Sequence, residues 1–202
     1  MENLVFVGMI IALIGTSTYI IQMFKGKAKP NRVSWLIWSI APLIAAFAAI
    51  SSGVTLAVIP VFMAGFGPLI VFIISLFIKE AYWKITKFDY ICGGLSILAL
   101  ILWYVTSNPK IAIIFSIISD FLACVPTIAK AWKYPETESS IAYLGGMFSA
   151  ATSFAAAGVW DFESLGYSIY LILADITIVF AINHKHIFKS KDIEKSQKKE
   201  KV

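Results

Sequence analysis

The fold is decided by the uncharged stretch between Arg32 and Lys79, where residues 33–78 are VSWLIWSIAPLIAAFAAISSGVTLAVIPVFMAGFGPLIVFIISLFI. A helix that crosses a bilayer needs roughly 20 mostly apolar residues, so this stretch is long enough for two crossings. It divides most naturally at residues 51–53, Ser-Ser-Gly, which favour a turn. Residues 3–24 are also uncharged and predict a further span. The chain is therefore expected to be an integral membrane protein.

The composition supports this class and argues against others. Of 202 residues, 59% are hydrophobic and only 14% are charged, too few to cover the surface of a soluble domain. The net charge of +5 does not indicate nucleic acid, because the basic residues form short clusters between apolar runs. Cys92 and Cys124 lie inside apolar runs and are interpreted as packing residues. We expect no metal and no cofactor, since no ligand spacing is present.

The apolar runs predict an all-α fold, a polytopic membrane protein with seven transmembrane helices. A signal peptide is not expected at the start, because the first run is long and is followed by four positive charges. Element boundaries drawn from sequence carry an error of a few residues. The predicted helices cover residues 3–24, 33–50, 55–78, 88–107, 111–130, 140–158 and 164–183.

The loop charges predict the orientation. Of the 17 basic residues, only Lys110 falls on one side of the seven-span topology, and the others share the opposite side. Basic loops stay in the cytoplasm, so the amino terminus is expected outside and the carboxyl tail inside the cell membrane. The tail, residues 185–202, is basic and polar, and is expected to be disordered or to rest on anionic lipid.

Helices one to three and five to seven share a layout. Each trio has a helix, a basic loop of about ten residues, and two helices joined by a short outer turn, and a shift of 108 residues superimposes the trios. Three spans lie between equivalent helices, which makes the repeats parallel. The predicted organisation is 3+1+3: repeats at residues 1–87 and 109–184, a linker helix at 88–108, and the tail at 185–202.

Residues 125–140, VPTIAKAWKYPETESS, resemble the motif of the PQ-loop repeat proteins, which include the SWEET sugar transporters and cystinosin-like carriers. In that family a helix ends with Pro-Gln or a related pair, then a short loop with a basic residue and Pro or Thr, then Ser and the next helix. Here Thr127 replaces the glutamine, and the first repeat has Thr18-Tyr19 with no proline. The resemblance implies the 3+1+3 plan and solute transport by alternating access.

Pro126 and Thr127 are candidate hinge residues. Pro126 has no N–H to donate to the carbonyl of Leu122, so it should bend the fifth helix. A bend at this position suits a helix that opens and closes a central cavity. The alternative is a static kink that improves packing.

Two carboxylates, Asp120 and Asp175, lie deep in apolar runs. Each is about ten residues from the outer end of its helix, which at about 1.5 Å per residue places both roughly 15 Å deep. Buried carboxylates usually face the bundle interior, and two at close range cannot both stay ionised. We hypothesise that one binds and releases a proton during transport. The alternative is a pair of protonated, purely structural hydrogen-bond partners.

Further polar and aromatic side chains accompany the aspartates. Ser116 and Cys124 flank Asp120 at four-residue spacing, and Ser168 lies two turns from Asp175, so each helix carries a polar stripe. Trp38 is a candidate cavity residue, because indole rings stack on sugars or attract amines. Trp35, nearer the helix end, is interpreted as an interface anchor.

These features favour a carrier for a small solute: a neutral sugar, an amino acid or a related metabolite, with proton coupling as an option. The alternative is a receptor, or a cargo- or lipid-binding protein, on the same scaffold without transport. An enzyme is not expected, because no paired metal ligands, activated nucleophile or phosphate-binding loop is present. Two acids without a basic partner argue against a simple anion. The expected partners are the bilayer, the solute and protons, and the chain is expected as a monomer or homo-oligomer.

Overall fold

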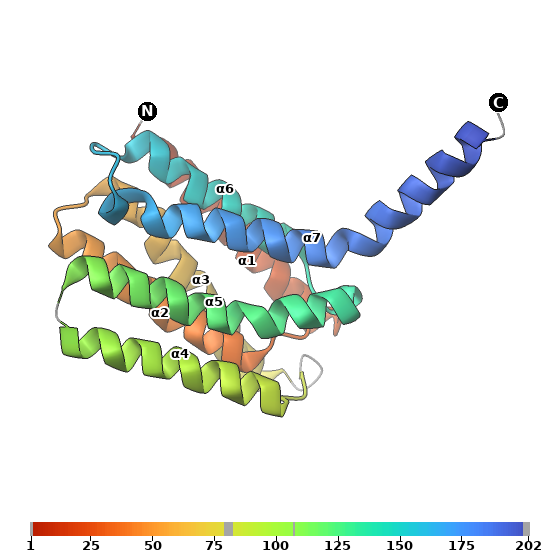
Figure 1. Cartoon of the computed structure of the whole chain (residues 1–202), viewed down its shortest axis with the longest axis horizontal. Coiled ribbons are helices and arrows are strands. Elements are labelled where there is room, and N and C mark those ends of the chain that lie inside the picture. The colour runs from red at the N-terminus through yellow and green to blue at the C-terminus, as the bar shows by residue number, and fades with distance from the viewer. Residues whose placement is uncertain (1, 79–82, 107, 200–202) are drawn as a thin grey trace.

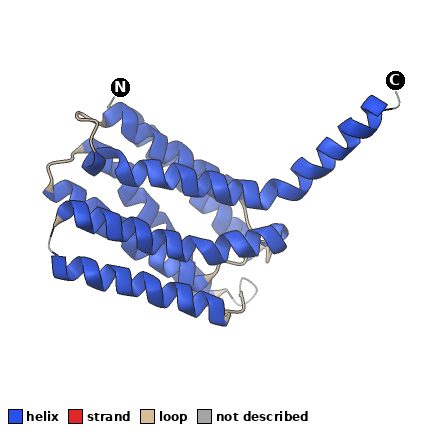
Figure 2. Ribbon diagram, in the orientation of Figure 1, coloured by secondary structure: helices blue, strands red, loops and turns tan. Residues whose placement is uncertain are grey.

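The computed structural model describes residues 2–78, 83–106 and 108–199, and these residues form helices joined by short loops, with no strand among them (Figure 2). Short 3-10 turns at Leu56–Val58 and Pro135–Thr137 precede two of the helices. The seven α-helices in the described residues agree with the predicted ranges to within a few residues, except at the end of the last one. They are α1 Leu4–Phe24, α2 Arg32–Ser51, α3 Ile59–Phe77, α4 Lys87–Thr106, α5 Pro109–Lys133, α6 Ser140–Ala156 and α7 Phe162–Lys199.

Local chemistry explains where several helices begin and end. The side chain of Asn31 accepts a hydrogen bond from the Val33 N–H at 3.1 Å and caps α2. Asn108 caps α5 in the same way, with Pro109 in the first turn, where its missing N–H costs nothing. Gly53 has a φ of 87° at the predicted turn between α2 and α3, a conformation that glycine adopts without strain.

The helices pack in a definite order. α3 packs against both α1 and α2, and α7 packs against both α5 and α6. Across the bundle α1 packs on α6, and α2 packs on α5. α4 packs mainly on α5 and lies at the edge of the bundle in Figure 1.

Glycines allow α1 and α6 to approach closely. A Cβ added to Gly145 would lie 3.1 Å from the carbonyl oxygen of Ile11, and one added to Gly15 would lie 3.2 Å from that of Ile141. Small residues at such crossings let backbones meet, which is a common way of packing helices in a bilayer.

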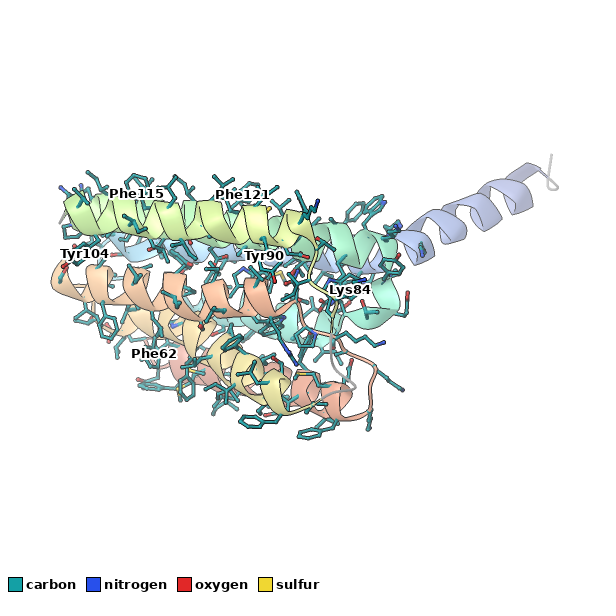
Figure 3. The ribbon with its side chains drawn as sticks, turned by 90° about the horizontal axis from the view of Figure 1, so that it is seen from below. Phe62, Lys84, Tyr90, Tyr104, Phe115 and Phe121 are labelled. Atoms are coloured by element: carbon teal, nitrogen blue, oxygen red, sulfur yellow. The ribbon has the colours of Figure 1, made fainter. Side chains whose placement is uncertain are left out.

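The surface of the bundle is apolar and its interior carries polar groups. Phe62 and Phe121 are 40% and 52% exposed on the outer faces of their helices (Figure 3), whereas Asp120 and Lys130 are 3% and 4% exposed inside. Among the described residues, α1, α2, α3 with its preceding turn, α5 and α7 as far as Lys185 are long and apolar enough to cross a membrane. This distribution is typical of a membrane protein.

The structure corrects the prediction for the tail. α7 does not end near residue 183 but continues as a helix to Lys199 and projects from the bundle in Figure 1. Residues 185–199 contain no Pro or Gly and are rich in Lys, with Glu and Gln, which have high helix propensity. A helix that is already nucleated by α7 extends through such a sequence at little cost.

Candidate solute-binding cavity

A cavity of about 100 Å³ lies inside the bundle, with room for several water molecules or a compact solute. Among the described residues, every helix except α4 contributes to its lining. Three of the predicted site residues meet here. Asp175 from α7 faces the same cavity as Asp120 and Cys124 from α5. Trp38 of α2 also lines the cavity.

Asp120 is held by two tyrosines of α7. The Tyr167 hydroxyl donates to its Oδ1 at 3.0 Å, and the Tyr170 hydroxyl donates to its Oδ2 at 2.6 Å. Both oxygens are thus bonded, and these two bonds favour the ionised carboxylate, in opposition to burial, which disfavours it. The indole N–H of Trp38 donates to the backbone carbonyl of Asp120 at 3.3 Å and fixes the ring at the cavity wall.

Asp175 is placed differently. Its side chain makes no hydrogen bond or ion pair with the described residues, although it lines the cavity. The carboxylate lies over Gly146 of α6, where an added Cβ would be only 2.8 Å from Oδ2. A glycine at position 146 therefore provides the space that this acid occupies. Of the two carboxylates, Asp175 is the one with oxygens available to a solute or a proton.

Aromatic rings and a hydroxyl complete the wall. Trp35 and Trp38 meet edge to face with ring centroids 5.5 Å apart, and Trp38 meets Tyr143 at 6.3 Å. Ser149 is 2% exposed and lines the cavity, and its Oγ has no partner among the described residues. No Lys, Arg or His belongs to the described residues that line the cavity. The ionisable side chains of the cavity lining are therefore acidic ones, Asp120 and Asp175.

Four other residues that the sequence singled out lie away from the cavity lining. Ser168 donates to Ser153 Oγ at 2.9 Å and so joins α7 to α6. Ser116 is fully buried, and its hydroxyl has no partner among the described residues. Pro126 and Thr127 are buried in α5, which stays helical through both, so the hinge is still a prediction.

The interpretation of Trp35 as an interface anchor was wrong. Trp35 is 5% exposed, lines the cavity and packs on Tyr19 with ring centroids 4.7 Å apart. α2 packs on α3 and α5, and in its first turn both Ser34 and Trp35 are buried against protein.

A buried polar network that was not predicted from the sequence lies at the basic end of the bundle. Lys130 and Glu138 form an ion pair at 2.6 Å, and their side chains are 2% and 0% exposed. The hydroxyls of Tyr19 and Tyr143 donate to the other carboxylate oxygen at 3.0 and 2.9 Å. Lys130 also donates to the carbonyl of Lys29. The signal in the sequence is that Glu138 and Glu136 follow Lys130 and Lys133 in a loop on the basic side.

This network connects the two basic loops to the cavity. The N–H of Lys29 donates to the carbonyl of Thr137 at 3.0 Å, which joins residues 25–31 to residues 134–139. Tyr143 belongs to the network and to the cavity wall at once. The loops that carry the basic residues are therefore held together directly beside the cavity.

At the opposite end, Asp161 caps α7. Its Oδ1 accepts a hydrogen bond from the Ser164 N–H at 2.9 Å, and this bond lowers the pKa of the exposed Asp161 carboxyl. Glu163 forms a surface ion pair with Lys110 at 3.2 Å. Neither carboxylate reaches the cavity, so both provide controls for it.

No protein-family model, curated protein or solved structure matches the chain. Among the residues that the structure describes, no group of three or more His, Cys, Asp or Glu is placed to hold a metal ion. The function is therefore inferred from the cavity and the helices that build it.

Proposed function

We propose that this chain is a small-solute carrier that spans the cell membrane seven times, with the amino terminus outside and the carboxyl end in the cytoplasm. The observation that carries the proposal is an interior cavity to which the first three and last three helices both contribute, with two carboxylates in its wall. Ionisable groups at membrane depth are costly to insert and commonly mark the path of a solute or a proton.

The cavity lining supports two parallel repeats. The shift of 108 residues that superimposes the two trios of helices also pairs many residues of the cavity wall with one another. In two parallel repeats, residues that pair in this way would occupy equivalent places in the two halves. The pairs are Ala12 with Asp120, Thr16 with Cys124, Trp35 with Tyr143, Trp38 with Gly146, and Met63 with Leu171.

Helix packing supports the same organisation. If α1, α2 and α3 are exchanged with α5, α6 and α7, the α1–α3 contact becomes α5–α7, and α2–α3 becomes α6–α7. The α1–α6 contact becomes α5–α2, which is also present. α4 stands outside this set, as a linker between two three-helix units would. Transporters built from repeats commonly rock one unit against the other around a central site.

The two halves differ in chemistry at equivalent positions. The first half has a bulky ring at Trp38 and a small residue at Gly67, whereas the second has Gly146 and Asp175 there. The first half thus supplies both tryptophans of the wall, and the second half supplies both acids. The solute is expected to lie between them, in contact with both units, so that their relative motion changes its access.

The acids bias the choice of solute. A like charge 4 Å away costs about 4 kcal/mol at an effective dielectric constant of 20, so an anion beside an ionised Asp120 is disfavoured. The two phenols that donate to Asp120 support its ionised form. Neutral and positively charged solutes remain, and proton coupling through Asp175 is part of the proposal.

The network around Glu138 supplies the closure at the cytoplasmic end. Opening to that side requires residues 25–31 to separate from residues 134–139, which would break the bonds of Lys130 and Tyr19 to Glu138. Lys130 lies one turn after Pro126 on α5. A hinge at Pro126 would move Lys130 relative to the cavity, which fits a bend that opens and closes this end.

Flux measurements test the proposal. The purified full chain in proteoliposomes is screened with labelled sugars, amino acids and amines, with and without a pH gradient, and empty liposomes give the background. Accumulation or exchange of at least one solute above background is expected. Asp161→Asn is the matched control, because it removes a carboxylate outside the cavity and asparagine keeps the cap. Saturable binding without flux would instead indicate the receptor alternative and overturn the carrier.

A further inference from the structure

Resting on the carrier function proposed above, we propose that Asp175 binds a small organic cation and a proton in turn, so that the protein exchanges one for the other across the membrane. The observation is the position of this carboxylate. It lines the cavity, makes no hydrogen bond with the described residues, and shares that cavity with the rings of Trp35 and Trp38. An organic cation can pair with a free carboxylate and is attracted by aromatic rings, and this cavity offers both.

The groups around Asp175 leave it as the binding carboxylate. From α5, Asp120 and Cys124 face the same cavity, and Asp120 is already bonded through both oxygens to Tyr167 and Tyr170. From α6 come Tyr143, whose hydroxyl is committed to Glu138, and the unpaired Ser149 hydroxyl. The parts of α1, α2 and α3 that line the cavity bring no titratable group. No cation of the protein neutralises Asp175 from any of these helices.

The unpaired polar groups suit an ammonium or guanidinium ion better than a sugar. A sugar presents several hydroxyls, and each would need a partner once it is buried. The phenols of Tyr143, Tyr167 and Tyr170 and the Trp38 N–H are already used within the protein. A cation needs only acceptors, here Asp175 and Ser149, and the indole rings of Trp35 and Trp38 in the wall would add cation–π attraction. The cavity of about 100 Å³ limits the ion to a compact one.

Exchange follows from the use of one carboxylate. When Asp175 holds a proton it cannot pair with the cation, and when it pairs with the cation it has released the proton. The empty, ionised carboxylate would be an uncompensated charge at membrane depth, so the unloaded carrier should not change its access. Each turnover therefore moves one monovalent cation in one direction and one proton in the other, with no net transfer of charge.

Three planar probes of similar size and different charge test the binding site: guanidinium, urea and nitrate. Titration calorimetry on the full chain in lipid nanodiscs at pH 7, in two buffers of different ionisation enthalpy, measures both affinity and proton release. We expect guanidinium alone to bind, with release of up to one proton. Asp175→Asn should abolish binding, and Asp161→Asn should leave it unchanged. Equal binding of urea or nitrate, or guanidinium binding that is unaffected by Asp175→Asn, overturns the proposal.

A second measurement needs no variant. Between pH 8 and pH 5 the wild-type affinity for guanidinium should fall, by up to tenfold per pH unit once Asp175 takes up protons, because proton and cation compete. An affinity independent of pH over this range overturns the exchange.

Flux then separates the two proposals. In proteoliposomes, an outward guanidinium gradient should drive internal acidification. Binding of guanidinium with proton release but without flux would support the cation site and overturn the carrier function. Transport of a neutral solute that guanidinium does not inhibit keeps the carrier and overturns the cation site.

Discussion

Lys130→Met should destabilise the fold through the charge that it leaves behind. The ion pair with Glu138 is 2.6 Å long, and the two side chains are 2% and 0% exposed. Removal of one partner from such a pair typically costs about 3–5 kcal/mol, because the other charge stays buried and uncompensated. Glu138 keeps its bonds from Tyr19 and Tyr143, so the lower end of this range, about 3 kcal/mol, is expected.

A double-mutant cycle isolates the pair. Glu138→Gln alone leaves the ammonium of Lys130 buried, and a similar loss of about 3 kcal/mol is expected. The double variant Lys130→Met with Glu138→Gln buries no charge and should lie within about 1–2 kcal/mol of the wild type, so that the two effects are far from additive. Lys133→Met, one turn further at an exposed position, is the control and should change stability by no more than about 0.5 kcal/mol.

Reversible unfolding in mixed micelles at pH 7 gives the four free energies of unfolding. A Lys130→Met variant within about 1 kcal/mol of the wild type would refute the buried ion pair. Additive losses in the double variant would show that Lys130 and Glu138 act independently, which the contact geometry does not permit.

Three further predictions concern the cavity. Gly146→Ala places a Cβ 2.8 Å from Asp175 Oδ2 and should weaken solute binding about tenfold or more. Gly94→Ala is the control and should leave binding unchanged, because its added Cβ has nothing within 4 Å. Equal effects of the two substitutions would contradict the placement of Asp175. Tyr170→Phe removes a donor to Asp120 and should lower the free energy of unfolding by about 1.5–3 kcal/mol, against little change for the exposed Tyr90→Phe. The variant Cys92→Ser keeps Cys124 of the cavity lining as its only thiol. Saturating solute should slow the reaction of Cys124 with a small neutral thiol reagent, measured by mass spectrometry. A reaction rate that solute does not alter would place the solute elsewhere.

Much of the fold could be predicted because a bilayer imposes simple constraints on the sequence. The lengths of the apolar runs gave most helix boundaries to within a few residues, and Ser-Ser-Gly gave the turn at residues 51–53. The tail was an exception, because low hydropathy marks the end of a span but not the end of a helix. Residues 185–199 are too polar for the membrane and still favour the helix.

Part of the site could be predicted from depth alone. Asp120 and Asp175 stand at similar distances along parallel helices, and a carboxylate at that depth must face inward, so their meeting in one cavity followed from the sequence. Ser168 did not join them, because a helical stripe is wider than a cavity and Ser153 of α6 lies nearer to it. The resemblance of residues 125–140 to PQ-loop proteins stays a prediction.

The network at the basic end could not be predicted, because its members come from five separate segments. Glu138 lies in a loop, and nothing in the sequence indicates that Tyr19, which is 119 residues away, donates to it. Lys130 was counted among the basic residues that set the topology, and its burial depends on how residues 25–31 fold over it. Pairings of this kind depend on tertiary packing alone.

The central claim is that Asp120 and Asp175 serve one transported solute from a shared cavity. Solute uptake into proteoliposomes, measured across a pH gradient for Asp120→Asn, Asp175→Asn and the control Asp161→Asn, tests it most directly. Both cavity variants should lose uptake or its dependence on pH, while the control keeps both. Uptake and pH dependence that survive in both cavity variants would contradict the claim.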